Sequence, residues 1–306
     1  MSNRTLTVDG ETISLSHPNK VLFPEDGLTK ADLADYYQRV APMMLPHLRG
    51  RALTLHRFPD GIGANGFYQQ NRSDHFPPWL PAARLEHGGD TGEVTHILCQ
   101  RAADLVYLAG QGTLTLHAWL SQVRRPRRPD QLVFDLDPPG DDFEPVRRAA
   151  WQVGDAMRDA GLTPFVKTTG SRGLHVVVPL HPGADFDRVR RACQCLADHL
   201  AARHPDTLTT EQRKSKRRGR LYLDLMRNVF GQTAVAPYAV RAKPGAPVAT
   251  PLDWNELSDT TIGPRRYTLG NIFRRLGQKA DPWANMAREA ADIGKLETAL
   301  DAWGRH

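Results

Sequence analysis

The run QLVFDLDPPG at residues 131–140 restricts the fold more than any other stretch of the chain. Its apolar residues alternate with residues of a second face, which is typical of a buried or half-buried β-strand. The second face ends in two carboxylates, Asp135 and Asp137. Residues i and i+2 of a strand point to the same side about 7 Å apart, so two like charges converge on one patch of the predicted sheet.

Further strands and helices follow this run in a regular order. Residues 143–160 and 185–203 have helical periodicity, and PFVKTTG, LHVVVPL and RLYLDLM are typical of strands. The order strand, helix, strand, strand, helix, strand indicates a split βαβ, or RRM-like, sheet. We therefore predict an α/β (α+β) fold with a mixed RRM-like sheet that carries the aspartates, a β-rich N-terminal lobe and C-terminal helices.

The chain has no internal repeat, low-complexity tract or obvious linker. We predict one domain over residues 1–306, with an N-terminal lobe of about residues 1–128 and a catalytic lobe of about residues 129–306. Within the first lobe, Thr29 can cap a helix that has Asp32 at its third position, a capping-box pattern.

Composition excludes several classes of protein. No run of about 18 apolar residues exists and MSNRTLTVDGETIS lacks an apolar signal segment, so we expect a cytoplasmic protein that does not bind a membrane. The three cysteines, Cys99, Cys193 and Cys195, are too few for a disulfide framework and match no zinc spacing, so buried thiols are expected. A net charge of +6 and a pI near 9.4 favour a polyanionic partner.

The paired carboxylates indicate a metal site. A hard divalent cation with oxygen ligands would offset their repulsion, and two such ions can clamp the attacking and leaving oxygens of a phosphoryl transfer. Asp224, which interrupts the apolar run RLYLDLM, is a third candidate ligand. The alternative is structural: Asp137 begins the turn at DPPG, and Asp135 meets solvent where the strand ends.

The segment KTTGSRGLHVVV adds candidate donors for a triphosphate. GSRG is a turn between two strand-like runs, and its backbone N–H groups, Ser171, Arg172 and then His175 suit that ligand. Taken alone, the segment is an ordinary hairpin turn with a structural histidine.

Other interpretations of the motifs remain to be weighed. GIGANG at residues 61–66 fits G-x-G-x-x-G, but FYQQNRSDHFPPW follows and no helix can start there, so we predict a loop and no dinucleotide site. DLD also resembles the Asp-x-Asp phosphohydrolases, although Pro138 and Pro139 stand where Gly-Thr is usual. A third alternative is a DNA-end-binding module without catalysis.

DLDP, TTGSRGLH and LYLDLMRNVFGQTAVAPYAVRAKPGAPVATPLDW together closely resemble the polymerase domain of bacterial DNA ligase D, a branch of the archaeo-eukaryotic primase superfamily. The resemblance covers nearly the whole chain and implies the primase-polymerase fold. It implies a nucleotidyltransferase that extends primers at gaps and broken DNA ends in non-homologous end joining, with NTPs or dNTPs and often a preference for ribonucleotides. It also implies two Mn²⁺ or Mg²⁺ ions, the partners Ku and a ligase, and a nucleoid-associated location.

The resemblance assigns roles at the nucleotide. Asp135, Asp137 and Asp224 match the catalytic metal ligands of the family. The nucleotide contacts would be Ser171, Arg172 and His175, with His117 of LTLHAW against the incoming nucleotide and Arg241 and Lys243 of YAVRAK on phosphate. We expect YAVRAK to be a strand whose Arg241 and Lys243 share a face; the family usually has arginine at the second position, and lysine lacks its bidentate fork.

The resemblance also assigns DNA contacts. Lys20 and Lys30, with Asn19 as a helper, would hold a downstream 5′-phosphate, because Lys30 begins a helix whose N–H groups and dipole favour an anion. Phe67 and Tyr68 match an aromatic pair that stacks on template bases, usually with phenylalanine second. The basic run EQRKSKRRGR, usually a solvated loop, is expected to hold the DNA backbone through Arg213, Lys214 and Lys216.

Overall fold

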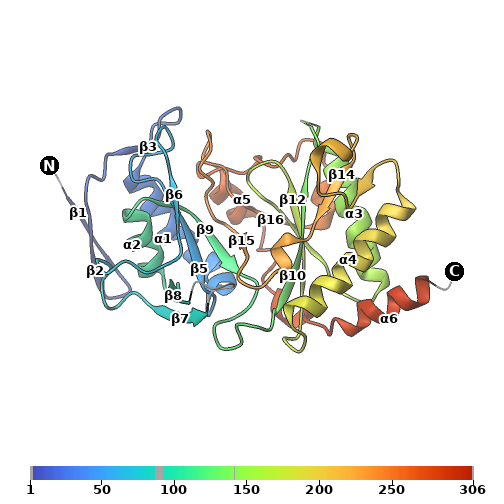
Figure 1. The fold of residues 1–306 in the computed structure, drawn as a ribbon. Helices are drawn as coiled ribbons and strands as arrows, with labels where there is room; N and C mark the ends of the chain where they lie inside the picture. Colours follow the sequence, from blue (N-terminus) through green and yellow to red (C-terminus); the bar gives the residue numbers. More distant parts are fainter. Residues whose placement is uncertain (1–2, 87–91, 141, 305–306) are drawn as a thin grey trace. The chain divides into compact units, whose positions relative to one another are not determined.

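The computed structural model describes residues 3–86, 92–140 and 142–304, which form two compact units (Figure 1). Unit 1 is built from the segments Met1–Trp119, Thr233–Thr250 and Tyr267–Asp281, and unit 2 from Leu120–Gln232, Pro251–Arg266 and Pro282–His306. Each unit is described by itself.

Unit 1 contains a six-stranded sheet of order β15-β9-β5-β8-β7 in which β6 also pairs with β5, together with the two-stranded sheets β1-β2 and β3-β4. Helices α1 and α2 pack against each other. The elements are β1 (Arg4–Val8), β2 (Glu11–Leu15), β3 (Val21–Phe23), β4 (Leu28–Thr29), α1 (Lys30–Leu48), β5 (Leu53–Arg57), β6 (Phe67–Gln69), β7 (Ala82–Glu86), β8 (Glu93–Ile97), α2 (Ala102–Gly110), β9 (Thr113–Trp119), β15 (Thr233–Val235) and α5 (Ile272–Gln278).

Helix α1 begins as the capping pattern predicts. The Thr29 side chain accepts from the backbone N–H of Asp32, and the Asp32 carboxylate accepts from the backbone N–H of Thr29. Two buried tyrosines of the helix attach it to distant backbone. The Tyr36 hydroxyl donates to the Tyr238 carbonyl at 2.7 Å, and the Tyr37 hydroxyl donates to the Leu114 carbonyl at 2.6 Å. These bonds satisfy the phenols in the apolar core.

Unit 2 contains the six-stranded sheet β13-β14-β10-β12-β11-β16, in which every neighbouring pair is antiparallel except β13 and β14. The elements are β10 (Gln131–Asp137), α3 (Glu144–Asp159), β11 (Phe165–Thr168), β12 (Leu174–Pro179), α4 (Phe186–Arg203), β13 (Leu208–Thr209), β14 (Leu221–Asp224), β16 (Pro251–Leu252) and α6 (Gly294–Trp303), with 3₁₀ turns η1 (Lys214–Lys216), η2 (Met226–Asn228), η3 (Trp254–Ser258) and η4 (Met286–Glu289).

The predicted order of strands and helices is observed in unit 2, and its four main strands lie in the order β14-β10-β12-β11. Helix α3 packs on β10, β12 and β14, and Figure 1 shows α3 and α4 on the same side of the sheet. The apolar side chains Leu132, Phe134 and Leu136 are buried. Because side chains alternate along a strand, Asp135 and Asp137 point to the opposite face from these three residues.

The division of the chain differs from the predicted lobes. Segments 233–250 and 267–281 belong to unit 1, although we expected everything after about residue 128 to form one catalytic lobe. The reason is long-range pairing: β15 is antiparallel to β9, with Val235 opposite His117. No local pattern of apolar residues could indicate this pairing.

The cysteines follow expectation only in part. Cys99 and Cys193 are buried, whereas Cys195 is exposed, and all three are free thiols. Within the described ranges, none of the helices has the length and apolar character needed to cross a membrane.

A buried side chain continues the sheet where β14 ends. The Asn228 side chain accepts from the Val133 N–H at 2.8 Å and donates to the Val133 carbonyl at 2.7 Å and to the Leu225 carbonyl at 3.2 Å. It therefore takes the place of a strand partner for the middle of β10. It also fixes the turn η2, which presents Arg227.

Replacing Asn228 by alanine is expected to lower the free energy of unfolding by about 2 to 4 kcal/mol, because the buried N–H and C=O of Val133 lose their partners. Urea denaturation of the variant and of the wild type measures the difference. The exposed Asn255→Ala, which changes the same residue type on η3, should stay within about 0.5 kcal/mol of wild type. Equal losses in the two variants would contradict the proposed role of Asn228.

Candidate active site

Four ionisable side chains form a row across the sheet of unit 2. Asp135 on β10 lies directly opposite Asp224 on β14 and opposite His175 on β12. His175 lies in turn opposite Lys167 on β11. Directly paired residues of antiparallel strands point to the same face, so all four share the face that Asp137 also occupies.

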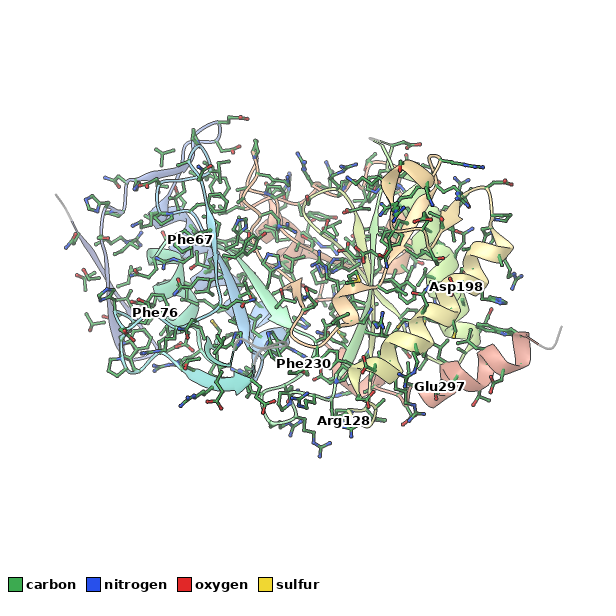
Figure 2. All side chains as sticks on the ribbon, viewed as in Figure 1. Phe67, Phe76, Arg128, Asp198, Phe230 and Glu297 are labelled. Carbon is green, nitrogen blue, oxygen red and sulfur yellow. The ribbon has the colours of Figure 1, made fainter. Side chains whose placement is uncertain are left out.

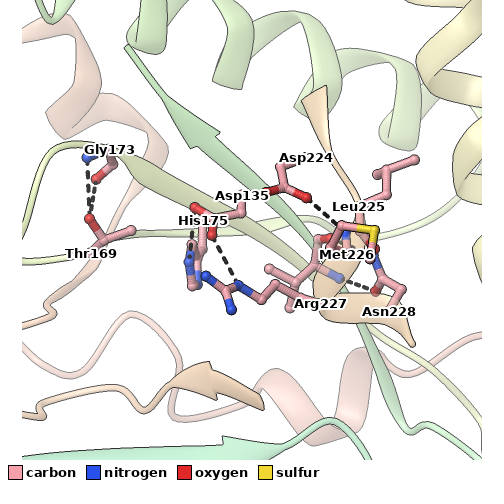
Figure 3. Close-up of polar contacts among 10 residues, drawn as sticks. Asp135, Thr169, Gly173, His175, Asp224, Leu225, Met226, Arg227 and Asn228 are labelled. Atoms are coloured by element: carbon pink, nitrogen blue, oxygen red, sulfur yellow. Dashed lines mark hydrogen bonds and ion pairs between the residues drawn. The ribbon is translucent and has the colours of Figure 1, made fainter. Parts of the chain in front are cut away.

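Asp135 is a buried carboxylate with two partners, as Figure 3 shows. His175 Nε2 lies 3.3 Å from Asp135 Oδ1, and Arg227 Nε donates to Asp135 Oδ2 at 3.1 Å. Burial by itself would raise the pKa of Asp135, but His175 and Arg227 more than offset burial and hold that pKa well below its usual range. Asp135 is therefore ionised at neutral pH.

His175 is buried and neutral at the same pH. Burial, together with the nearby charge of Lys167, lowers the pKa of His175 to about 4. A neutral imidazole that donates from Nε2 to Asp135 has its proton on that nitrogen. The pair is therefore a neutral donor and an anionic acceptor, and Arg227 supplies the compensating positive charge.

The other two carboxylates are destabilised by their surroundings. Burial, followed by the charge of Asp135, raises the pKa of Asp137. Burial also raises the pKa of Asp224, whose Oδ1 accepts from the Met226 N–H at 2.8 Å, and the charge of Asp135 adds to this effect. Three partly desolvated carboxylates that repel one another make a site that attracts cations.

A tight turn lies beside the carboxylates. Thr169 Oγ1 accepts from the backbone N–H groups of Ser171 and Gly173 at 3.3 and 3.2 Å. A Cβ on Gly173 would lie 2.0 Å from the Leu136 carbonyl and 2.7 Å from Asp137 Oδ1, so only glycine allows this approach. The Arg172 side chain donates to the carbonyls of Pro138 and Gly140 and thereby joins the two loops. The expected triphosphate donor thus has a structural contact of its own.

The donor set fits a divalent metal, although no ready-made centre is present. Among the residues that the structure describes, no group of three or more His, Cys, Asp and Glu side chains has the geometry to hold a metal ion. Both oxygens of Asp135 are engaged by His175 and Arg227. Carboxylate oxygens are nevertheless the ligands that Mg²⁺ and Mn²⁺ prefer, and Arg227 occupies the place of a counter-cation.

The basic run before β14 is partly engaged with its own backbone. Arg217 donates to the carbonyls of Glu211 and Gln212, and its guanidinium lies 4.1 Å from the centre of the Tyr222 ring. The three residues predicted to hold the DNA backbone, Arg213, Lys214 and Lys216, are exposed. The run leads directly into the strand that carries Asp224.

An aromatic cluster occupies the sheet of unit 1. Phe67 and Tyr68 on β6 are 47% and 62% exposed, which is unusual for large aromatic side chains. Tyr68 stacks on His56 with ring centres 4.0 Å apart and lies 5.9 Å from the ring of His117. Burial and the charge of Arg241 lower the pKa of His56 to about 4, so Arg241 lies near this cluster.

The prediction of a strand at YAVRAK is wrong. Only an isolated bridge pairs Val240 with Val248, and the Lys243 N–H donates to the Arg241 carbonyl at 2.8 Å. Such an i to i+2 bond closes a turn, so Arg241 and Lys243 do not share a face of a regular strand. Pro244 and Gly245 follow immediately and continue the turn. The phosphate roles of Arg241 and Lys243 stay predictions without that geometric support.

Lys20 and Lys30 lie together, as the predicted phosphate site requires. The Lys30 N–H donates to the Lys20 carbonyl at 2.9 Å, and Lys20 Nζ is paired with the Asp60 carboxylate. Lys30 is buried, and its Nζ donates to the Ser16 carbonyl at 3.0 Å. Asn19 is exposed beside them.

The helix N-terminus contributes less to this site than we expected. The N–H groups of the first three helical residues donate to the Lys20 carbonyl, the Pro18 carbonyl and Thr29 Oγ1. These backbone donors are therefore used within the protein. An anion here would depend on the lysine side chains.

Comparison with known proteins decides the family. Residues 29–283 match the family described as LigD, primase-polymerase domain. The chain is a member of this family.

Similar proteins agree with this assignment. The chain is 31% identical over 291 residues to the multifunctional non-homologous end joining protein LigD of Mycolicibacterium smegmatis, which covers 94% of this chain and 38% of that protein. It is 33% identical over 280 residues to the protein of the same name from Pseudomonas aeruginosa, covering 90% of this chain and 33% of that protein. The solved polymerase domain from Mycobacterium tuberculosis Ligase D in complex with DNA has a TM-score of 0.84 at 30% identity, over 91% of this chain and 99% of that one.

Membership of the LigD primase-polymerase family makes this domain a polymerase-type nucleotidyltransferase with a mixed α/β fold. Divalent metal use follows from the family. The chain spans between 33% and 38% of the length of these two curated relatives.

Three residues that contact predicted site residues were not found from the sequence. Arg227 and Asp60 pair with predicted site residues, and His56 stacks on Tyr68. For His56, the alternation in LTLHR indicates a strand, but only the observed pairing of β5 with β6 places the histidine opposite Tyr68. Arg227 and Asp60 lie in a turn and a loop, where no periodic pattern indicates where a side chain points.

The neutral state of His175 predicts a pH dependence of stability. Its pKa is about 4 when folded and about 6.5 when unfolded, so the unfolded chain binds more protons between these values. The free energy of unfolding should therefore fall by roughly 2 to 3 kcal/mol as the pH drops from 7 to 4.5, through this residue alone. Urea denaturation at several pH values measures the fall.

The variant His175→Gln should reduce the fall in the free energy of unfolding between pH 7 and 4.5. The variant His181→Gln, at an exposed position, should leave that fall unchanged. If the curves of wild type and His175→Gln run parallel from pH 7 to 4.5, His175 is not a buried neutral histidine.

Proposed function

We propose that this domain is a metal-dependent, DNA-directed nucleotidyltransferase that extends primers and fills short gaps at DNA ends, in non-homologous end joining. The observation that carries the proposal is the register that aligns Asp224, Asp135 and His175 across three strands, with Asp137 on the same face. The printed names of the curated relatives support the end-joining role, and the DNA complex of the Mycobacterium tuberculosis domain supports DNA as the partner.

The three aspartates would hold Mn²⁺ or Mg²⁺, most simply as a two-metal site. Such ions supply activation of a primer 3′-hydroxyl and neutralisation of the triphosphate. Asp135 is kept ionised by His175 and Arg227, so it is ready to act as a ligand. A metal held by Asp135 Oδ2 would compete with Arg227 for that oxygen, and the Arg227 guanidinium would then suit a phosphate.

The nucleotide contacts that the resemblance implies are described within each unit separately. In unit 2, Ser171 and Arg172 lie on the turn closed by Thr169, and His175 lies beside Asp135. In unit 1, His117 packs with the Tyr68 ring, and Arg241 and Lys243 supply positive charge on a turn. A preference for ribonucleotides is part of the proposal and rests on the family resemblance.

The DNA contacts and partners complete the proposal. Lys20, Lys30 and Asn19 would hold a 5′-phosphate, Phe67 and Tyr68 would stack on template bases, and the exposed run Arg213, Lys214 and Lys216 would contact the backbone. Exposed aromatic side chains and basic side chains suit these ligands. Ku and a ligase would be the partners of the reaction.

Two alternatives are weaker. Membership of the LigD primase-polymerase family argues against an Asp-x-Asp phosphohydrolase. The Gly-Thr that usually follows the aspartates in that class is also missing, because Pro138 and Pro139 stand there. A DNA-end-binding module without catalysis would have no need of three mutually repelling carboxylates, whose raised pKa values at Asp137 and Asp224 cost stability.

Asp137→Ala is expected to reduce nucleotide addition by a factor on the order of 100 or more, because one ligand of the charge-stabilising site is lost. Extension of a labelled primer on a short-gapped duplex with a 5′-phosphate measures this, with Mn²⁺ and either ribo- or deoxynucleotides. The comparison of the two nucleotides also gives the sugar preference.

Asp198→Ala is the matched control, since it removes a carboxylate from the exposed side of α4, labelled in Figure 2. Binding of Mn²⁺ followed by electron paramagnetic resonance should fall in Asp137→Ala and not in Asp198→Ala. Full extension by Asp137→Ala would exclude the metal assignment. Wild type that binds the DNA without extending it would favour the end-binding module.

Lys20→Ala is expected to remove most of a preference for gaps with a 5′-phosphate over gaps with a 5′-hydroxyl, whereas Asp60→Asn should retain or increase it. The reason is that the Asp60 carboxylate pairs with Lys20 and would compete with the phosphate for it. Binding of the two gapped duplexes measures the preference. Lys30→Ala is less informative because Lys30 is buried. An unchanged preference in Lys20→Ala would contradict the site.

A further inference from the structure

We infer that the loop 121–130 of unit 2, which we name the arginine loop, is a second surface for the sugar-phosphate backbone of duplex DNA. Its sequence SQVRRPRRPD contains four arginines against one aspartate. The loop precedes β10 and is visible in green at the lower edge of Figure 1. The inference rests on the proposed function in one respect, namely that the protein binds DNA.

The backbone of the arginine loop is ordered by its own hydrogen bonds. Ser121 forms a bridge with Pro129, and the Ser121 hydroxyl donates to the Pro126 carbonyl at 2.7 Å. Within this frame the Arg125 N–H donates to the Gln122 carbonyl, and the Arg128 N–H donates to the Arg125 carbonyl. A loop that is ordered before binding loses little conformational freedom when it binds.

The arginine side chains point to solvent and keep donors available. All four are exposed. Arg124 Nε donates to Gln122 Oε1 at 2.9 Å, and Arg128 Nη1 donates to the Gly183 carbonyl at 3.0 Å, so each retains other N–H groups. Among the described residues, Arg124, Arg125 and Arg128 have no carboxylate within ion-pair distance. Guanidinium groups that have no carboxylate partner and that extend from an ordered backbone are well suited to bind phosphates.

The fourth arginine shows how the loop is attached to the unit. The Arg127 guanidinium lies 4.9 Å from the centre of the Phe230 ring, and Figure 2 labels Phe230 and Arg128 in the same region. The one aspartate of the loop, Asp130, accepts from Gln122 Nε2 at 2.9 Å. Arg127 and Asp130 therefore help to hold the loop, and Arg124 and Arg125 are its most available cations.

The arginine loop cannot serve the nucleotide at the carboxylates. It enters the first residue of β10, whereas Asp135 and Asp137 lie at the other end of that seven-residue strand. At about 3.3 Å per residue, the first residue of the strand lies about 13 Å from Asp135 and about 20 Å from Asp137. The larger distance exceeds the reach of one triphosphate and equals roughly six base pairs of duplex.

Duplex backbone fits this surface better than single-stranded nucleic acid. Single strands are usually bound by aromatic side chains on which bases stack. The exposed large apolar side chains of the described residues are Val21, Phe67, Tyr68 and Met226, and none of them is in the loop. Contacts between arginine and phosphate position the DNA and carry no sequence information. The contact would therefore be independent of DNA sequence.

The double variant Arg124→Ala/Arg125→Ala tests the inference. Fluorescence anisotropy of a labelled blunt duplex is measured at several KCl concentrations for the full chain. The slope of log Kobs against log[KCl] should become less steep by about 1 to 2, because each phosphate contact contributes about 0.9 to the magnitude of the slope. Affinity at low salt should fall about tenfold, while primer extension at saturating DNA should keep its wild-type rate.

Two control variants separate the effect of where the arginines lie from the effect of their charge. Arg190→Ala/Arg191→Ala removes two adjacent exposed arginines from α4 of the same unit and should change the slope less than the loop variant. Arg124→Lys/Arg125→Lys keeps the charge and should keep the slope.

Each other outcome overturns the inference. A wild-type slope in Arg124→Ala/Arg125→Ala, with extension intact, rejects the arginine loop and leaves the proposed function standing. Equal losses in the loop and helix variants reject a specific surface. Wild-type protein that binds anionic vesicles, or nothing, and no duplex rejects the proposed function together with the loop.

Discussion

Burying the carboxylate of Asp135 within a sheet requires donors and positive charge close to it, because an isolated buried charge is very costly. His175 and Arg227 meet this requirement from two different elements, β12 and η2. Each therefore has a fixed place relative to β10. Removing either one would leave an uncompensated buried anion, so the arrangement around Asp135 tolerates little change.

The position of Arg227 depends on the short strand β14 and on Asn228. Because β14 ends at Asp224, the chain can turn at once into η2, and Asn228 then satisfies the backbone of Val133 that β14 no longer reaches. A longer β14 would satisfy Val133 through backbone bonds, but it would carry Arg227 along the strand and away from Asp135. The early end of β14 thus replaces regular strand pairing by the Asn228 side chain and allows the Arg227 guanidinium to reach Asp135.

Much of unit 2 could be predicted because its signals are local. Alternating apolar residues indicated β10, helical periodicity indicated α3 and α4, and the carboxylates at i and i+2 of β10 share a face as expected. The capping pattern at Thr29 likewise marked the start of α1. The sequence did not indicate which strands pair over long distances, so the membership of β15 in unit 1 was missed. The prediction of a strand at YAVRAK failed because the chain turns at Lys243, and Pro244 and Gly245 continue that turn.

The site residues that escaped prediction share a physical role. Arg227 pairs with Asp135 and Asp60 pairs with Lys20, so each neutralises the charge of a predicted binding residue. A motif indicates the residue that binds, whereas its resting partner only has to bring the right charge to within about 4 Å and can come from any nearby turn or loop. A ligand at either proposed site would have to compete with this internal ion pair, and the net free energy of binding would be the difference between the two interactions. The intrinsic attraction of the carboxylates or of Lys20 for such a ligand would accordingly exceed the affinity that the folded protein displays.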